Sequence, residues 1–312
     1  MLIPDTDFLS MKKNSFKELV KYPFNERYLK IDNVNLCYID EGKGLPLLFI
    51  HGLGGNLLHY KMNLPFFREN YRVIAVDLPG FGKSDKPELH DPVNYYVHLL
   101  KKFVKKLGID ELVIIGNSMG GHVGCLFAAR YKKYAKGLIL VDSAGMNELT
   151  FIENFFISNI FNESLLSKTP SFIMETTLKH NFYHAREEVN DILLAQKAMV
   201  GSKDYDDFCH AMEYCAKSMK NNPLDDILSE IQCPTLIVWG KNDRLIDVKH
   251  AGYFNKGIAG SKLIIYNSCG HISQLEKYED FNKDVSQFLI DNELNKQAKF
   301  RKFFGLFKKE KP

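Results

Sequence analysis

Eight short apolar runs constrain the fold of this chain more than any other feature of its sequence. Each run has four or five residues, and most are separated by turn residues or by segments with helical periodicity. Such runs are typical of buried strands, and their alternation with helices favours a parallel sheet covered by helices. We therefore predict an α/β fold with strands at residues 28–31, 35–39, 47–50, 72–76, 112–115, 137–141, 235–239 and 262–266.

The alternation stops between the sixth and seventh predicted strands. Residues 146–228 have helical patterns and many aromatic residues, and no convincing strand. Because the strand pattern resumes afterwards, we predict a helical cap inserted into one core domain of residues 28–145 and 229–292. An N-terminal extension (residues 1–27) and a C-terminal tail (residues 293–312) complete this prediction.

The most informative local motif follows the predicted strand 112–115. Residues 116–121 read Gly-Asn-Ser-Met-Gly-Gly, and apolar residues at helical spacing come directly after them. A serine at the apex of such a sharp strand-to-helix turn is held in a strained conformation, and the flanking glycines allow the strand and helix to pack closely. The arrangement therefore indicates that Ser118 is a nucleophile at the start of a helix.

This combination of motifs resembles the α/β-hydrolase fold family over roughly residues 28–290. The resemblance implies a mostly parallel sheet flanked by helices, with an inserted helical cap above the active site. The elbow is similar to those of hydrolases that cleave carbon–carbon bonds in ring-fission products of aromatic degradation, and also to those of some esterases.

A serine hydroxyl needs a base to accept its proton and a carboxylate to orient that base. His271 follows the last predicted strand in a segment that resembles the catalytic-histidine loop of the family. Asp243 follows the strand at 235–239, where the family carries its acid, and the order Ser118, Asp243, His271 is the expected one. Asp142, after the strand at 137–141, is the alternative acid.

Acyl transfer also needs two N–H donors for the oxyanion. The resemblance assigns these donors to Met119, directly after the nucleophile, and to Leu53, in the His-Gly-Leu-Gly-Gly loop that begins at His51. We interpret His51 itself as a structural residue. The glycine-rich segment 77–85 lacks the spacing of a phosphate-binding loop and is interpreted as backbone architecture near the pocket.

We predict no cofactor and no metal, because the histidine and cysteine pairs of the chain do not form a ligand constellation. The six cysteines are far apart and form no CxxC pair, and no secretory signal or membrane-spanning run is present. These features predict a cytoplasmic protein. A formal net charge of +3 does not suggest a nucleic-acid partner.

The positive charge is concentrated in residues 296–312, which carry seven basic residues against one acid. Four phenylalanines in this segment have helical spacing (Phe300, Phe303, Phe304 and Phe307). The pattern predicts a basic amphipathic helix that binds an anionic membrane surface on the inner face. The alternatives are docking on the protein's own surface and a frayed tail.

The sequence thus predicts a serine hydrolase of an apolar acyl ester, resembling carboxylesterases and lipases. The first alternative is carbon–carbon bond hydrolysis. It ranks second because Leu275 stands where those hydrolases usually have tryptophan and because their oxyanion loop is richer in glycine. Arg186 could bind a substrate carboxylate, but its segment equally suits an exposed helical turn. The other alternative is a binding protein that keeps the fold without catalysis.

Overall fold

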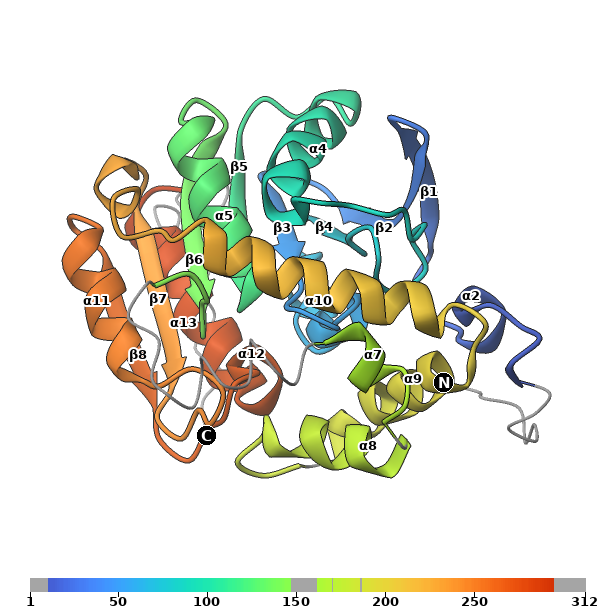
Figure 1. Cartoon of the computed structure of the whole chain (residues 1–312). Helices are drawn as coiled ribbons and strands as arrows, with labels where there is room; N and C mark the ends of the chain where they lie inside the picture. Colours follow the sequence, from blue (N-terminus) through green and yellow to red (C-terminus); the bar gives the residue numbers. More distant parts are fainter. Residues whose placement is uncertain (1–10, 147–161, 170, 186, 295–312) are drawn as a thin grey trace, which may run out of the picture.

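The computed structural model describes residues 11–146, 162–169, 171–185 and 187–294. Its centre is an eight-stranded sheet with the order β1-β2-β4-β3-β5-β6-β7-β8 (Figure 1). The strands are β1 (Arg27–Ile31), β2 (Val34–Gly42), β3 (Pro46–Ile50), β4 (Arg72–Val76), β5 (Leu112–Asn117), β6 (Ala135–Val141), β7 (Thr235–Gly240) and β8 (Lys262–Tyr266). All eight predicted strands are confirmed, with small differences at their ends.

Only β2 runs against the direction of the other strands. Strand β2 pairs antiparallel with both β1 and β4, whereas β4, β3, β5, β6, β7 and β8 pair in parallel. A two-residue turn joins β1 to β2, with φ of 48° at Asp32 and 69° at Asn33. Positive φ at both positions suits the tight turn of a hairpin, and Asn and Asp tolerate it better than other side chains.

Helices flank this sheet. Helix α5 packs against β3, β5 and β6, α4 packs against α5, and α11 packs against β7 and β8. The longer helices are α4 (Pro92–Lys106), α5 (Met119–Arg130), α8 (Ser171–His180), α9 (Asn190–Gly201), α10 (Tyr205–Asn221), α11 (Lys249–Gly257) and α13 (Tyr278–Asp291). The short ones are α2 (Phe16–Leu19), η1 (Leu57–Tyr60), α3 (Leu64–Phe67), α7 (Glu163–Leu166), η3 (Glu187–Val189), η4 (Leu228–Glu230) and α12 (Ser273–Glu276).

Helices α7 to α10 all lie between β6 and β7 in the chain, where the sequence predicts an insertion without strands. In Figure 1, α7, α8 and α9 gather at the end of the sheet toward which β6 and β7 point, and α10 runs across to α4. We refer to residues 162–221, as far as they are described, as the helical segment. The predicted cap boundaries themselves stay a prediction.

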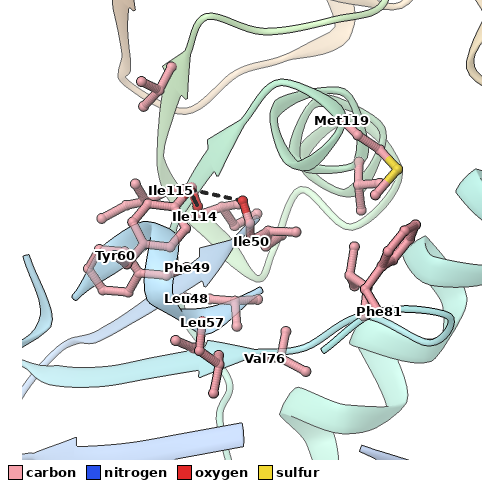
Figure 2. Close-up of a cluster of buried hydrophobic side chains, with 14 of the residues drawn as sticks. Leu48, Phe49, Ile50, Leu57, Tyr60, Val76, Phe81, Ile114, Ile115 and Met119 are labelled. Atoms are coloured by element: carbon pink, nitrogen blue, oxygen red, sulfur yellow. Dashed lines mark hydrogen bonds between the residues drawn. The ribbon is translucent and has the colours of Figure 1, made fainter. Parts of the chain in front are cut away.

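The buried core continues from the central strands into the segment after β3. Figure 2 shows side chains of β3 and β5 packed with Leu57 and Tyr60 of η1. The Tyr60 hydroxyl donates a hydrogen bond to the Ile50 carbonyl oxygen at 2.9 Å, so the phenol is buried without losing its polar partner. This packing fixes η1 close to the carboxyl ends of β3 and β5.

The N-terminal residues that the structure describes are part of this core. Met11, Phe16, Leu19 and Val20 are all buried, and the Tyr22 hydroxyl donates a hydrogen bond to Asp77 Oδ2 at 2.9 Å. Phe16 also contacts the large cavity described below. The described part of the segment before β1 is therefore packed into the buried core.

Candidate active site

Ser118 stands between the end of β5 and the start of α5, as the sequence predicts. Its backbone has φ of 53° and ψ of −117°, a strained conformation for a residue other than glycine. The turn is held by hydrogen bonds, because Ser118 N donates to Val141 O and Ser118 O accepts from the N–H groups of Gly121, His122 and Ala144. The strain is thus maintained by the surrounding backbone.

The glycines beside Ser118 have a direct steric role. A Cβ atom on Gly116 would lie 2.2 Å from Gly120 O, and one on Gly120 would lie 2.1 Å from Ile50 O. Both contacts are with backbone, which cannot rotate away as a side chain can. The elbow therefore requires glycine at both positions in order to bring α5 against β3 and β5.

His271 and Asp243 come together from the loops that follow β8 and β7. The Nδ1 atom of His271 lies 2.7 Å from Asp243 Oδ2, and both side chains are almost completely buried. Asp243 Oδ1 accepts hydrogen bonds from the N–H groups of Leu245 and Ile246, at 2.8 and 3.0 Å. The carboxylate is therefore fixed in orientation before it contacts the imidazole.

Burial and charge act in opposite directions on His271. Burial by itself disfavours the imidazolium, but the negative charge and hydrogen bond of Asp243 outweigh it, and the charge of Asp142 adds to their effect. The net result is a pKa of His271 above the usual 6.5. A histidine in this state is a stronger base than a free imidazole, as proton abstraction from a serine requires.

Asp142, the alternative acid, is buried but bonds to other groups. Its Oδ1 accepts from Gly240 N at 2.7 Å and from Ser273 Oγ at 3.1 Å, and its Oδ2 accepts from Ser273 N at 3.1 Å. Burial and the nearby Asp243 raise the pKa of this carboxyl group. Asp142 therefore joins the ends of β6 and β7 to α12, whereas Asp243 is the carboxylate that contacts His271.

Asn117, the residue before the nucleophile, connects the elbow to the histidine loop. Its Nδ2 donates to His271 O at 3.1 Å and to Val141 O at 3.2 Å. His271 N in turn donates to Asn181 O, at 2.7 Å, in the helical segment. The backbone of His271 is thus held from both the sheet and the helical segment.

The predicted oxyanion loop lies beside the nucleophile. A Cβ atom on Gly52 would lie 3.1 Å from Ser118 Cβ, and both Leu53 and Ser118 line the same cavity. Met119 is the first residue of α5, so its N–H belongs to the orphan donors at a helix start. Leu53 in this loop and Met119 at the start of α5 are compatible with the predicted hole.

His51 has a structural position. Its Nδ1 lies 2.7 Å from Gly52 O, and its Nε2 accepts a hydrogen bond from Leu78 N at 3.0 Å. Burial lowers its pKa to about 4, so the ring is neutral, with the proton on Nδ1. His51 therefore fastens the oxyanion loop to the segment after β4.

The glycine-rich segment 77–85 is organised around a buried carboxylate. Asp77 accepts hydrogen bonds from Leu57 N and Lys83 N, each at 2.8 Å, in addition to the bond from Tyr22. A Cβ atom on Gly82 would lie 2.2 Å from this carboxylate, which explains the glycine there. Gly82 also lines the cavity. These contacts agree with a role in backbone architecture near the pocket.

A cavity of about 740 Å³ lies above Ser118 and His271. Its wall includes apolar residues of the oxyanion loop, the N-terminal segment and the helical segment, among them Leu53, Phe16, Ile192, Met199 and Phe208. Three further apolar residues of the wall are also open to solvent: Leu165 is 52%, Phe172 67% and Ile173 43% exposed. The cavity can hold a substrate with a sizeable apolar part.

Two polar residues of this wall are not recognisable from sequence. His59, in η1, is only 5% exposed, and Gln196 lies on α9. Within the described residues, neither His59 Nδ1 nor Gln196 Oε1 has a hydrogen-bond partner, although both atoms are buried. Neither residue belongs to a motif, and their proximity to the cavity depends on the packing of α9 against η1.

Several sequence predictions concern residues that the structure does not describe in full. The side chain of Arg186 and the tail at residues 296–312 lie outside the described residues. Among the residues that are described, no group of three or more potential ligand side chains is arranged to hold a metal ion. No helix in the described ranges is both long and apolar enough to cross a membrane.

The fold and the grouped residues at the strand ends define a hydrolase of the α/β class. The family model of the alpha/beta hydrolase fold matches residues 46–278, and the chain belongs to this family. The match covers the sheet from β3 onward together with the elbow and the loops that carry Asp243 and His271.

Two curated relatives extend over most of the chain. A 2-hydroxy-6-oxononadienedioate/2-hydroxy-6-oxononatrienedioate hydrolase of Klebsiella pneumoniae is 29% identical over 279 residues, covering 84% of this chain and 95% of the relative. A 2-hydroxy-6-oxo-6-(2'-aminophenyl)hexa-2,4-dienoic acid hydrolase of Metapseudomonas resinovorans is 27% identical over 290 residues, covering 89% and 95%.

Two solved structures have the same fold. A membrane phospholipase A described as a bacterial virulence factor has a TM-score of 0.74 and 27% identity, covering 86% of each chain. A serine hydrolase involved in carbazole degradation has a TM-score of 0.71 and 26% identity, covering 85% of this chain and 98% of its own.

Proposed function

We propose that this protein is a serine hydrolase that cleaves a carbon–carbon bond next to a ketone, in a conjugated substrate of the meta-cleavage-product type. The observation that carries the proposal is the named activity of the relatives, which match this chain over nearly their whole length.

In this proposal, Ser118 Oγ attacks the ketone carbon while His271 takes its proton, and Asp243 stabilises the imidazolium. The N–H groups of Leu53 and Met119 hold the oxyanion. The dienol reacts as its keto tautomer, in which the proton of the 2-hydroxyl group has moved to the carbon beside the ketone that Ser118 attacks. The carbon–carbon bond then breaks, and its electron pair moves onto the leaving carbon, where conjugation with the carbonyl group formed from the 2-hydroxyl stabilises it. That carbon receives the proton from His271.

The acyl group remains on Ser118 as an ester. Water then attacks this ester, with His271 as the base, and releases a carboxylic acid and the free serine. Each step uses the same three side chains, so ester hydrolysis differs only in the leaving group. In both reactions the helical segment acts as a cap that limits access of water to the cavity.

Hydrolysis of an apolar ester is the second candidate. The exposed apolar residues at the cavity wall, Leu165, Phe172 and Ile173, favour it because such a surface suits a lipid-like substrate. The similarity to the phospholipase A structure, at 27% identity, supports the same substrate class. The sequence motifs favour this candidate, whereas the named activities of the relatives favour carbon–carbon hydrolysis.

One comparison of rates tests both candidates. The full-length protein is assayed with 2-hydroxy-6-oxo-6-phenylhexa-2,4-dienoate, by loss of its visible absorbance, and with p-nitrophenyl esters from acetate to palmitate. We expect kcat/KM for the dienoate to exceed that of the best ester by at least about tenfold, a difference of about 1.4 kcal/mol in transition-state binding.

Ser118→Ala is the matched control and should abolish turnover of both substrates. A higher kcat/KM for an ester reverses the order of the two candidates. If folded wild-type protein cleaves neither substrate and does not react with a fluorophosphonate probe, both catalytic proposals fail and the binding-protein alternative takes their place.

A further inference from the structure

A buried carboxylate beside the histidine loop has no part in the proposed mechanism. Glu276 is the last residue of α12 and is only 6% exposed. Its Oε2 accepts hydrogen bonds from Gly270 N at 2.8 Å and Tyr183 N at 3.1 Å, and its Oε1 accepts one from His184 N at 2.7 Å. Hydrogen bonds to a carboxylate are stronger than those between neutral groups, so Glu276 holds three backbone N–H groups firmly.

The three donors come from two parts of the chain. Gly270 directly precedes His271 in the loop after β8, whereas Tyr183 and His184 follow α8 in the helical segment. The side chain of Glu276 therefore joins the histidine loop to the helical segment. All three hydrogen bonds are made to backbone, so they fix the course of the chain itself.

The two segments are also in direct contact. His271 N donates to Asn181 O at 2.7 Å. A Cβ atom on Gly270 would lie 2.4 Å from Asn181 O and 2.9 Å from Phe182 Cα, so only glycine permits this approach. The two segments therefore lie backbone against backbone, and the Glu276 carboxylate bridges them.

The position of this loop decides what His271 can do. Its Nδ1 must stay 2.7 Å from Asp243 Oδ2 while its other ring nitrogen reaches Ser118. Without the Glu276 carboxylate, the N–H group of Gly270 would be buried without this acceptor, and the loop would shift to satisfy it. A displacement of about 1 Å at a catalytic group can cost about a hundredfold in rate.

The influence of Glu276 on His271 passes through the backbone. Burial lowers the pKa of His271, and the carboxylates that raise it are those of Asp243 and Asp142. Among the described residues, the cavity wall includes His271 and Asn181 but does not include Glu276. Any effect of Glu276 on the reaction must therefore be exerted through the base.

We infer that Glu276 is a positioning residue, which sets the place of His271 between Asp243 and Ser118 by holding the histidine loop against the helical segment. This inference rests on the proposed function, because it concerns the base of that mechanism. It gives the helical segment a second role, since the segment supports the base in addition to covering the cavity.

The first variant for the test is Glu276→Gln. An amide of the same size keeps one oxygen, but its NH₂ group faces an N–H donor in either orientation. We expect the second-order rate constant for reaction of Ser118 with a fluorophosphonate probe to fall by at least about tenfold, because His271 is displaced. This reaction needs only the nucleophile and its base, so the result does not depend on which bond the enzyme cleaves.

The pKa of His271 is the second readout, and it does not depend on activity. NMR of protein with labelled histidine measures this pKa, and the signal is assigned by its absence from His271→Asn. Because Asp243 raises the pKa against the effect of burial, a displaced imidazole in Glu276→Gln should titrate at least about 0.5 pH unit lower. A general loss of stability would reduce the folded fraction without moving this pKa.

Three further variants serve as comparisons. Glu279→Gln removes the charge of an exposed residue on α13 and should leave both readouts unchanged. Glu276→Asp keeps both carboxylate oxygens and should retain more of the rate than Glu276→Gln. Gly270→Ala acts from the other side of the contact, where the methyl group would meet Asn181 O, and should lower both the rate constant and the pKa. It keeps the test decisive if Glu276→Gln does not fold.

The outcomes separate this inference from the proposed function. If folded Glu276→Gln reacts with the probe as fast as the wild type, or if its rate falls while the pKa of His271 stays unchanged, Glu276 is not a positioning residue. If the wild-type protein does not react with the probe, the proposed function fails. A lower pKa of His271 in Glu276→Gln then still supports the inference, and an equal pKa overturns it.

Discussion

The Nδ1 atom of His271 lies 2.7 Å from Oδ2 of Asp243, although the two residues follow different strands. Asp142 is also buried near this pair, but its carboxylate bonds to Gly240 and Ser273. The geometry therefore distinguishes the two carboxylates, either of which could be the triad acid on sequence alone. One of them contacts the imidazole, and the other fastens the surrounding backbone.

The first prediction follows from this separation. Asp243→Asn should lower kcat by about 10⁴, as in serine hydrolases whose orienting carboxylate is replaced by an amide. Asp142→Asn should cost less than about 10², because it removes no direct contact with His271. Steady-state kinetics with the better substrate provide the measurement, and an equal loss in both variants would contradict the assignment of the acid.

The pH profile of the wild-type enzyme provides a second prediction. His271 must be neutral to accept the serine proton, and Asp243 raises its pKa above 6.5. The rate should therefore fall as the pH drops through a value above 6.5. Removing the negative charge in Asp243→Asn leaves burial as the dominant effect, so the acid limb of kcat/KM should move to lower pH. A limb that stays in place would exclude His271 as the titrating base.

The third prediction concerns the glycines of the elbow. Gly120→Ala should destabilise the fold by about 1–3 kcal/mol, because the new methyl group would meet the Ile50 backbone. Gly252→Ala, on the exposed side of α11, has open space around it and should stabilise the protein by about 0.5–1 kcal/mol. Denaturant unfolding of both variants measures the two changes in stability. If Gly120→Ala costs no stability, the elbow can widen to accept the methyl group, and the prediction is wrong.

A fourth prediction uses a buried histidine outside the cavity. Burial lowers the pKa of His122 from 6.5 to about 4, so the unfolded chain binds a proton more readily than the folded chain in this range. The free energy of unfolding should fall as the pH drops from 6.5 to 4, by up to about 1.4 kcal/mol per pH unit from this residue. His122→Leu should flatten the slope and the surface control His98→Leu should not, when unfolding is measured at several pH values.

The fifth prediction concerns the basic tail. Deletion of residues 296–312 should abolish co-sedimentation of the protein with anionic phosphatidylserine vesicles, and high salt should weaken the binding of the full chain. Ester or dienoate turnover in solution should be unaffected, since the triad residues all precede the tail. Equal sedimentation of the truncated and full-length proteins would exclude the tail as a membrane anchor.

Local patterns were sufficient to predict all eight strands and the elbow. The differences lie at the ends, where β5 extends to Asn117 and β7 to Gly240 because each pairs with a neighbouring strand. Such pairing depends on residues far away in the chain, so local sequence does not show it. The positions of Ser118, His271 and Asp243 were predictable because each follows a strand and lies in a recognisable motif.

The cavity wall was much less predictable. His59, Gln196 and Phe16 carry no motif, and each reaches the cavity through packing between distant segments. The apolar residues at the N-terminus could equally suit a surface helix, and only the folded chain shows Met11 and Phe16 buried in the core. Burial of this kind depends on tertiary packing, so the periodicity of the sequence cannot predict it.

The position of Phe16 has a practical consequence for engineering. The family match begins at residue 46, but a side chain thirty positions earlier forms part of the substrate cavity. A fragment trimmed to the matched region would keep Ser118, Asp243 and His271 but would lose Phe16 from the wall of the pocket. Exchange of this leading segment between homologous enzymes is therefore a route to altered selectivity that leaves the catalytic groups unchanged.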